Sequence, residues 1–114
     1  MQIETIEVRE KTTSEIQMTL YSNDEVIDLS TIDHIRLDLV DKRGTVYRFS
    51  SDDGSPQTRV VTAVSGIVGY APDSGDLIHS RSPYKGYWWV YTTTTLRYSV
   101  PEENEFMITV RKEF

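Results

Sequence analysis

The side chains best suited to metal chemistry are four loop aspartates. Asp52, Asp53, Asp73 and Asp76 all stand close to a glycine. Carboxylate oxygens in a tight turn are ligands that Ca²⁺ prefers, but this spacing lacks the alternating acidic start and the distal glutamate of an EF-hand loop. Aspartates in turns more often accept hydrogen bonds from their own backbone. The sequence therefore predicts no metal site at these positions.

The chain contains two histidines and no cysteine. His34 stands in a segment of strand character and His79 in a segment of loop character. Neither has a second histidine or a cysteine at a metal-binding spacing. We expect both histidines at the surface, and we expect no bound metal and no cofactor.

No hydroxyl group stands in a pattern that would activate it as a nucleophile. Serines and threonines are frequent, but none lies in a Gly-x-Ser-x-Gly turn, and no glycine-rich phosphate-binding loop is present. A glycosidase needs two carboxylates across a cleft, and a chain of 114 residues built mostly of strands has few residues left to form one. We predict that the protein is not an enzyme and has no catalytic residues.

The strongest local signal is aromatic. Residues 86–99, GYWWVYTTTTLRYS, hold five of the twelve aromatic residues of the chain. Successive side chains of a strand point to opposite faces, so Trp88 and Trp89 cannot both enter one core. We expect Trp89 and Tyr91 to point inward and Trp88 to point outward with Val90. An exposed tryptophan indicates a protein interface, with a platform for stacking a sugar and ordinary packing under a loop as the alternatives.

The elements that must position these residues are short strands. Alternating apolar and polar side chains predict strands over residues 1–8, 15–21, 34–41, 45–51, 57–64, 67–72, 86–93, 96–100 and 106–112. Residues 41–44, DKRG, fit a type I turn or a three-residue hairpin loop with Gly44 in the left-handed conformation. One short helical turn is expected near Leu77 and Ile78. The pattern predicts one all-β sandwich domain over residues 1–114.

Charge and hydropathy exclude several classes of partner. The net charge is −6 and the basic residues are scattered, so a surface that holds nucleic-acid phosphates is not expected. The opening segment MQIETIEVRE has no signal-peptide pattern. No apolar run approaches the roughly 20 residues of a membrane-spanning helix. We therefore expect synthesis in a cytoplasm without a signal peptide, and no nucleic acid or membrane as partner.

Five segments together carry a family resemblance. In order they are EIQMTLYSND, VIDLS before IRLDLVD, the hairpin DKRGTVYRF, SGIVGYAP, and KGYWWVYTTTTLRYSVPEENEFMITV. Their patterning over residues 12–111 resembles the amino-terminal domain of bacteriophage baseplate upper proteins. That domain is an immunoglobulin-like β-sandwich at the start of tail and fibre proteins. The resemblance implies an immunoglobulin-like antiparallel sandwich of about seven to nine strands.

The resemblance also implies a structural role in a virus particle. Such domains assemble around the tail tip and attach receptor-binding proteins. The trimerising helices and receptor-binding region that follow in that family have no counterpart in this sequence, so receptor recognition is not carried over. We expect a non-enzymatic subunit of a tailed virus, located in the virion, with other virion proteins and copies of itself as partners. The alternatives are a carbohydrate-binding module that holds a surface glycan, and a component of a bacterial secretion machine.

The predicted interface consists of exposed aromatic residues and two edge strands. Large aromatic side chains supply much of the binding energy of interfaces, and unpaired strand edges can pair with a neighbouring chain. The predicted edges are residues 1–8, with Ile6 and Val8 facing inward, and residues 106–114. The candidate interface residues are Tyr87, Trp88, Tyr98, Ile3, Ile6 and Phe114.

Overall fold

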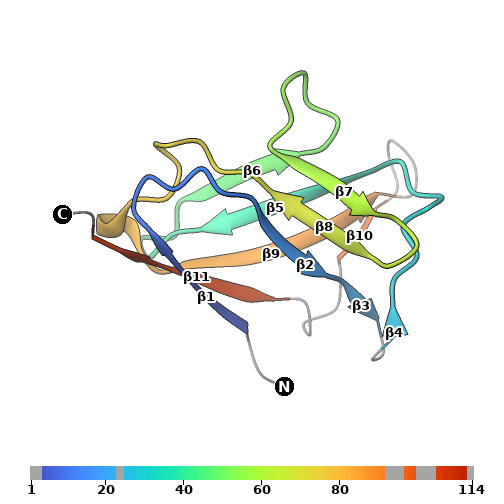
Figure 1. Cartoon of the computed structure of the whole chain (residues 1–114), viewed down its shortest axis with the longest axis horizontal. Helices are drawn as coiled ribbons and strands as arrows, with labels where there is room; N and C mark the ends of the chain where they lie inside the picture. Colours follow the sequence, from blue (N-terminus) through green and yellow to red (C-terminus); the bar gives the residue numbers. More distant parts are fainter. Residues whose placement is uncertain (1–3, 23–24, 92–96, 100–104, 113–114) are drawn as a thin grey trace.

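The chain folds as two β-sheets packed face to face, which confirms the predicted all-β sandwich (Figure 1). The computed structural model describes residues 4–22, 25–91, 97–99 and 105–112. Within them lie eleven strands. Three of these are only two or three residues long, and the eight longer ones match the expected number.

The larger sheet has the order β1-β11-β9-β5-β6, and β10 also pairs with β9. Its strands are β1 (Glu4–Arg9), β11 (Phe106–Arg111), β9 (Tyr84–Tyr91), β5 (His34–Val40), β6 (Val46–Ser50) and β10 (Arg97–Ser99). Neighbouring strands are antiparallel except β1 and β11, which run parallel. The expectation of a purely antiparallel sandwich therefore fails at this one edge.

The smaller sheet has the order β2-β8-β7 and covers one face of the larger sheet (Figure 1). Its strands are β2 (Ile16–Thr19), β8 (Ile67–Tyr70) and β7 (Thr58–Thr62), and a separate hairpin joins β3 (Tyr21–Ser22) to β4 (Glu25–Val26). A 3₁₀ turn, η1 (His79–Arg81), follows the predicted position of a helical turn by one residue. No helix in the part of the chain that the structure describes has the length and apolar character needed to cross a bilayer.

The alternation of β5 decides which face of the larger sheet is the core. Ile35, Leu37 and Leu39 are at most 1% exposed, and they face the smaller sheet. The hairpin after β5 forms as predicted, because Gly44 has a φ of 89° and its N–H donates to the carbonyl of Asp41 at 3.0 Å. A side chain with a Cβ rarely adopts that conformation.

The carboxylate of Asp41 holds the same hairpin together. It accepts hydrogen bonds from the N–H groups of Arg43 and Thr45 and from the hydroxyl of Tyr47, at 2.9, 3.0 and 3.0 Å. Desolvation acts to raise the pKa of Asp41, but these hydrogen bonds favour the charged form and the pKa is lowered. The turn is thus fixed by a side chain as well as by its glycine.

Trp88 lies in the core, and the expectation that it points outward is wrong. Its side chain is 2% exposed. The register places Trp88 opposite Leu37 and Val90 opposite Ile35, and directly paired residues share a face of the sheet. Since Leu37 and Ile35 face inward, Trp88 and Val90 must do so too. Trp89 and Tyr91 consequently point outward.

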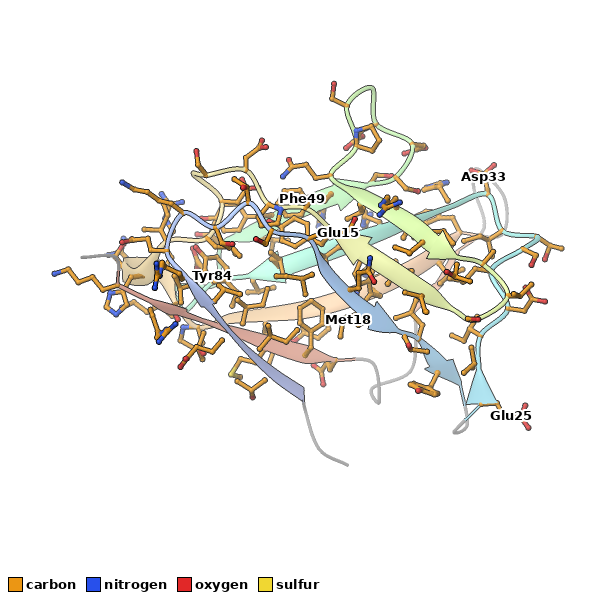
Figure 2. The ribbon with its side chains drawn as sticks, viewed as in Figure 1. Glu15, Met18, Glu25, Asp33, Phe49 and Tyr84 are labelled. Carbon is orange, nitrogen blue, oxygen red and sulfur yellow. The ribbon has the colours of Figure 1, made fainter. Side chains whose placement is uncertain are left out.

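The indole of Trp88 joins the two sheets. Its Nε1 donates to the sulfur of Met18, at 3.1 Å, across the sandwich from β2, and its ring packs 6.5 Å from that of Phe106. Met18 is labelled in Figure 2. The buried core residues form one cluster made of Leu20, Leu29, Ile35, Leu37, Leu39, Val68, Tyr70, Leu77, Tyr84, Trp88, Val90, Phe106, Ile108 and Val110.

The structure confirms one of the two predicted edge strands and contradicts the other. β1 lies at the edge of the larger sheet, and Ile6 and Val8 pack against the core as expected. The strand over residues 106–111 is not an edge, because β11 is hydrogen-bonded on both sides, to β1 and to β9. Ile3 and Phe114 lie outside the described residues.

Candidate functional site on the outer face of the larger sheet

The face of the larger sheet that points away from the core carries a row of cross-strand pairs. Between β5 and β9 the register pairs His34 with Tyr91, Arg36 with Trp89, and Asp38 with Tyr87. These residues alternate with the buried ones, so their side chains share the outer face. We call His34, Arg36, Asp38, Tyr87, Trp89 and Tyr91 the outer-face cluster.

An ion pair lies at the centre of the outer-face cluster. Arg36 Nε is 2.9 Å from Asp38 Oδ1, without hydrogen-bond alignment, and Arg36 Nη2 donates to Asp38 Oδ2 at 3.1 Å. The indole Nε1 of Trp89 donates to the same Oδ2 at 3.0 Å. The Asp38 side chain is only 11% exposed although it lies on an outer face. The guanidinium and the indole therefore shield and orient this carboxylate.

The aromatic rings of the cluster are held by the same arginine and by His34. Arg36 Nη1 donates to the hydroxyl of Tyr91 at 2.8 Å, and its Cζ lies 5.5 Å from the ring centre of Trp89. A guanidinium over an indole face is an attractive cation–π arrangement. The imidazole of His34 stacks on Tyr91 with ring centres 4.1 Å apart and planes 17° apart. The result is a surface whose side chains hold one another in place before any partner arrives.

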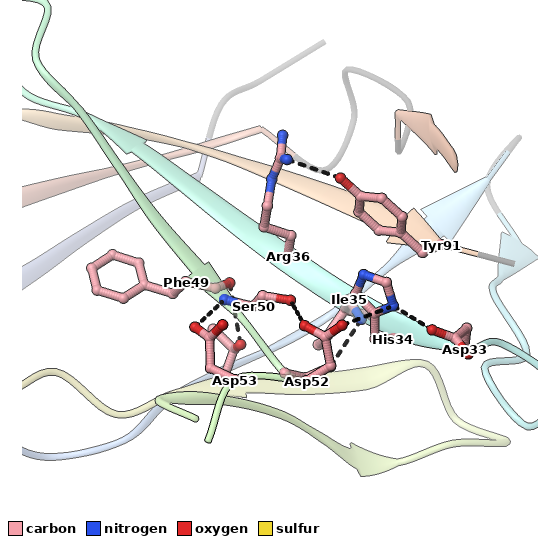
Figure 3. Close-up of polar contacts among 11 residues, drawn as sticks. Asp33, His34, Ile35, Arg36, Phe49, Ser50, Asp52, Asp53 and Tyr91 are labelled. Carbon is pink, nitrogen blue, oxygen red and sulfur yellow. Dashed lines mark hydrogen bonds and ion pairs between the residues drawn. The ribbon is translucent and has the colours of Figure 1, made fainter. Parts of the chain in front are cut away.

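A second group of polar side chains adjoins the cluster where β5 begins (Figure 3). His34 Nδ1 is 2.5 Å from Asp33 Oδ2 and 3.8 Å from Asp52 Oδ2. The hydroxyl of Ser50 donates to Asp52 Oδ1. That hydrogen bond is the main reason why the pKa of Asp52 is lowered; burial opposes it and the charge of His34 adds to it. We call Asp33, His34 and Asp52 the Asp–His–Asp group.

The predicted interface residues differ in their burial and in their place in the fold. Tyr87 is half-buried on the outer face, whereas Trp88 is in the core. Ile6 is half-buried against the core. The backbone of Tyr98 pairs with Val90, and its side chain lies outside what the structure describes. Of these residues, Tyr87 alone is seen in the outer-face cluster.

The two histidines differ from each other. His79 is exposed, as predicted. His34 is not a simple surface residue, because stacking on Tyr91 leaves its side chain only 10% exposed. Of the loop aspartates, Asp76 acts as expected within its own turn, where it accepts a hydrogen bond from the N–H of Asp73 at 2.8 Å.

Sequence reasoning missed the central residues of the cluster, namely Arg36, Asp38, Trp89 and Tyr91. The signal that could have found them is the polar half of the alternation in β5. Arg36 and Asp38 stand two positions apart in that strand, and so they share a face. The partners on β9 follow only once the register between the two strands is known.

Comparison with known proteins found no matching family model, no matching curated protein and no matching solved structure.

Proposed function

We propose that this protein is a non-enzymatic structural subunit that acts through protein–protein contacts, as part of a tailed virus particle. The observation that supports a contact role is the outer-face cluster, which presents arginine, tryptophan and tyrosine side chains in fixed positions. No described strand forms a third layer over this face. The viral setting rests on the resemblance of the strand and turn motifs to baseplate upper proteins.

The composition of the cluster suits an interface. Tryptophan, tyrosine and arginine are the residues most enriched among those that dominate binding energy. Side chains already held in place lose little conformational entropy when a partner docks. In this cluster Arg36 and Asp38 neutralise each other, so a partner that covers them does not have to bury an unpaired charge.

The test compares two single substitutions of exposed or half-exposed aromatic residues. Trp89→Ala removes the central ring of the outer-face cluster, whereas Tyr21→Ala removes an exposed ring on the β3–β4 hairpin. Sedimentation velocity is expected to show self-association of the wild-type protein and of Tyr21→Ala, with at least a tenfold weakening in Trp89→Ala. Circular dichroism establishes that each variant is folded.

The viral part of the proposal has a separate readout. Virus particles are purified from a culture that expresses this chain. Mass spectrometry of these particles is expected to detect the chain at a fixed ratio to the major tail or capsid protein. A protein that stays monomeric at all concentrations and is missing from such particles contradicts the proposal.

A carbohydrate-binding role is the second candidate, because Tyr87, Trp89 and Tyr91 stand in a row on one face of β9. Two contacts weigh against it. The ring of Tyr91 is covered by His34, and the guanidinium of Arg36 lies over Trp89, so less aromatic surface remains for a sugar. Glycan-array binding that is lost in Trp89→Ala would favour this role. Trp88→Ala is unsuitable for the purpose, since Trp88 is a core residue.

A further inference from the structure

We propose that the Asp–His–Asp group is a binding site for a single Zn²⁺ ion. Each of the three side chains offers one ligand atom, and these atoms all lie within 4.8 Å of one another. Imidazole nitrogen and carboxylate oxygen are both good zinc ligands. The proposal does not depend on the protein–protein role, and either one can fail alone.

The fold brings the three residues together from two separate segments. Asp33 and His34 stand where β5 begins, and Asp52 lies in the loop after β6. Two hydrogen bonds between Ile35 and Ser51 join these segments: the Ser51 N–H donates to the Ile35 carbonyl at 2.9 Å, and the Ile35 N–H donates to Ser51 Oγ at 3.0 Å. The ligands are thus held near one another by hydrogen bonds at the end of the β5–β6 pairing (Figure 3).

The imidazole is already oriented for the task. Its side chain is nine-tenths buried, because Tyr91 stacks on it, and its Nδ1 faces both carboxylates. The backbone of Asp33 is fixed as well, since its N–H donates to the carbonyl of Tyr91 at 2.8 Å. Asp52 is anchored through its other oxygen by Ser50, which leaves Oδ2 turned toward the histidine.

The present distances are close to those that zinc would require. Tetrahedral ligands about 2.1 Å from the metal lie about 3.4 Å from one another. The His34–Asp52 separation of 3.8 Å must shrink slightly, and the His34–Asp33 separation of 2.5 Å must grow. Rotation of two carboxylates achieves both changes. Water would complete the coordination.

The charge of the group also favours a dication. Two carboxylates flank one imidazole nitrogen, and the hydrogen on Nδ1 can point squarely at only one of them. The nearest arginine of β5, Arg36, is committed to Asp38. Zn²⁺ would bind Nδ1 of the neutral tautomer that carries its one proton on Nε2, so a proton on Nδ1 must leave that nitrogen when the metal binds.

The choice of metal follows from the ligand set. Ca²⁺ and Mg²⁺ prefer sites made wholly of oxygen, whereas the imidazole selects zinc and its neighbours in the transition series. Excess Ca²⁺ or Mg²⁺ should therefore not compete for the site.

The experiment is a calorimetric titration of the full chain with ZnCl₂ at neutral pH. One equivalent is expected to bind saturably, and Asp52→Asn and Asp33→Asn should each weaken binding at least tenfold. Asp52→Asn keeps a hydrogen-bond acceptor for Ser50 and an exposed position, so it should remain folded. The matched controls are Asp53→Asn, next along the same loop, and His79→Gln, which removes the exposed histidine; both should bind as the wild type does.

A second readout separates the site from adventitious binding. Saturating zinc should raise the melting temperature of the wild type and of both controls, and should raise that of Asp52→Asn by clearly less. The proposal is overturned if no saturable binding occurs, if Asp52→Asn binds as tightly as the wild type, or if His79→Gln is the variant that loses binding.

Discussion

The two adjacent tryptophans illustrate how much a single position along a strand decides. Trp88 is 2% exposed and bridges the sheets, whereas Trp89 lies on the outer face and donates to Asp38. The same type of side chain is thus buried in the core at one position and lies on the surface at the next. Substitutions at the two positions should therefore affect different properties.

Trp88→Ala is expected to lower the free energy of unfolding by about 3–5 kcal/mol, the range typical of removing a large buried aromatic side chain. Urea denaturation followed by far-UV circular dichroism measures the change. Tyr87→Ala, at the neighbouring outward position, is the control and should cost clearly less. A Trp88→Ala variant that is as stable as the wild type but fails to associate would show that this indole acts at a surface.

The sequence alone could not predict that some of the residues near the outer face lie close together. His34 and Asp52 are far apart along the chain, and neither stands in a metal-binding motif. They meet because the β5–β6 hairpin folds back, with Ser51 opposite Ile35. Spacing rules detect ligand sets that are local in sequence, and this one depends on the length of a hairpin.

At the level of elements, the alternation of β5 and the turn at Asp41–Gly44 were predictable, and the orientation of β9 was not. β5 has one apolar and one polar face, so its core side is evident from the sequence. β9 has aromatic residues on both faces, so alternation allows two solutions that differ by one residue. The register with Leu37 and Ile35 selects between them, and that register is non-local information.

Gly86 supplies a further reason for the orientation of β9. It is buried opposite Leu39 on one side and Phe106 on the other, and the ring of Phe106 lies over it. A Cβ at this position would overlap Cε1 and Cζ of that ring. An aromatic ring that covers a glycine in a neighbouring strand fixes the pairing of the two strands.

Gly86→Ala is expected to destabilise the protein by about 2 kcal/mol, because the added methyl group must displace a packed ring. Thermal and urea unfolding provide the measurement. Gly54→Ala is the matched control, since a Cβ there meets no atom within 4 Å, and it should be close to neutral. The double variant Gly86→Ala with Phe106→Leu should show a cost below the sum of the two single changes; strict additivity would argue against this clash.

At the scale of the whole molecule, one surface ion pair ties the smaller sheet together. The guanidinium of Arg59 on β7 makes two hydrogen bonds to Glu15, which directly precedes β2, at 2.7 and 2.9 Å. The carboxylate of Glu15 lies over Gly69 of β8, the strand between β2 and β7. The hydrogen bond from Arg59, with that from Gln17, lowers the pKa of Glu15 from 4.5 to about 2. Glu15 and Arg59 side chains are 23% and 61% exposed, so solvent screens the pair and its contribution is small.

The sign of the resulting pH dependence is fixed. A carboxylate whose pKa is depressed in the folded state stabilises that state above its unfolded pKa, and the stabilisation is lost as the pH falls from about 4.5 to about 2. The melting temperature of Glu15→Gln should therefore fall less than that of the wild type as the pH is lowered over that range. High salt should reduce the difference between the variant and the wild type.

Glu7→Gln is the matched control for this acid titration. It removes an exposed carboxylate 3.3 Å from Arg111 on the other sheet, and it should leave the acid profile close to that of the wild type. Identical acid profiles for Glu15→Gln and the wild type would contradict the assignment of this pH dependence to Glu15.

The parallel pairing of β1 with β11 bears on how the protein is made. The first strand of the described chain has its only sheet partner in residues 106–111, so a ribosome must translate nearly everything in between before that edge can close. Until then Ile6 and Val8, the apolar side chains of the nascent strand, cannot pack against the completed core. Completion of the larger sheet is therefore a late event in biosynthesis, and a chain interrupted before residue 106 would leave this strand exposed to aggregation.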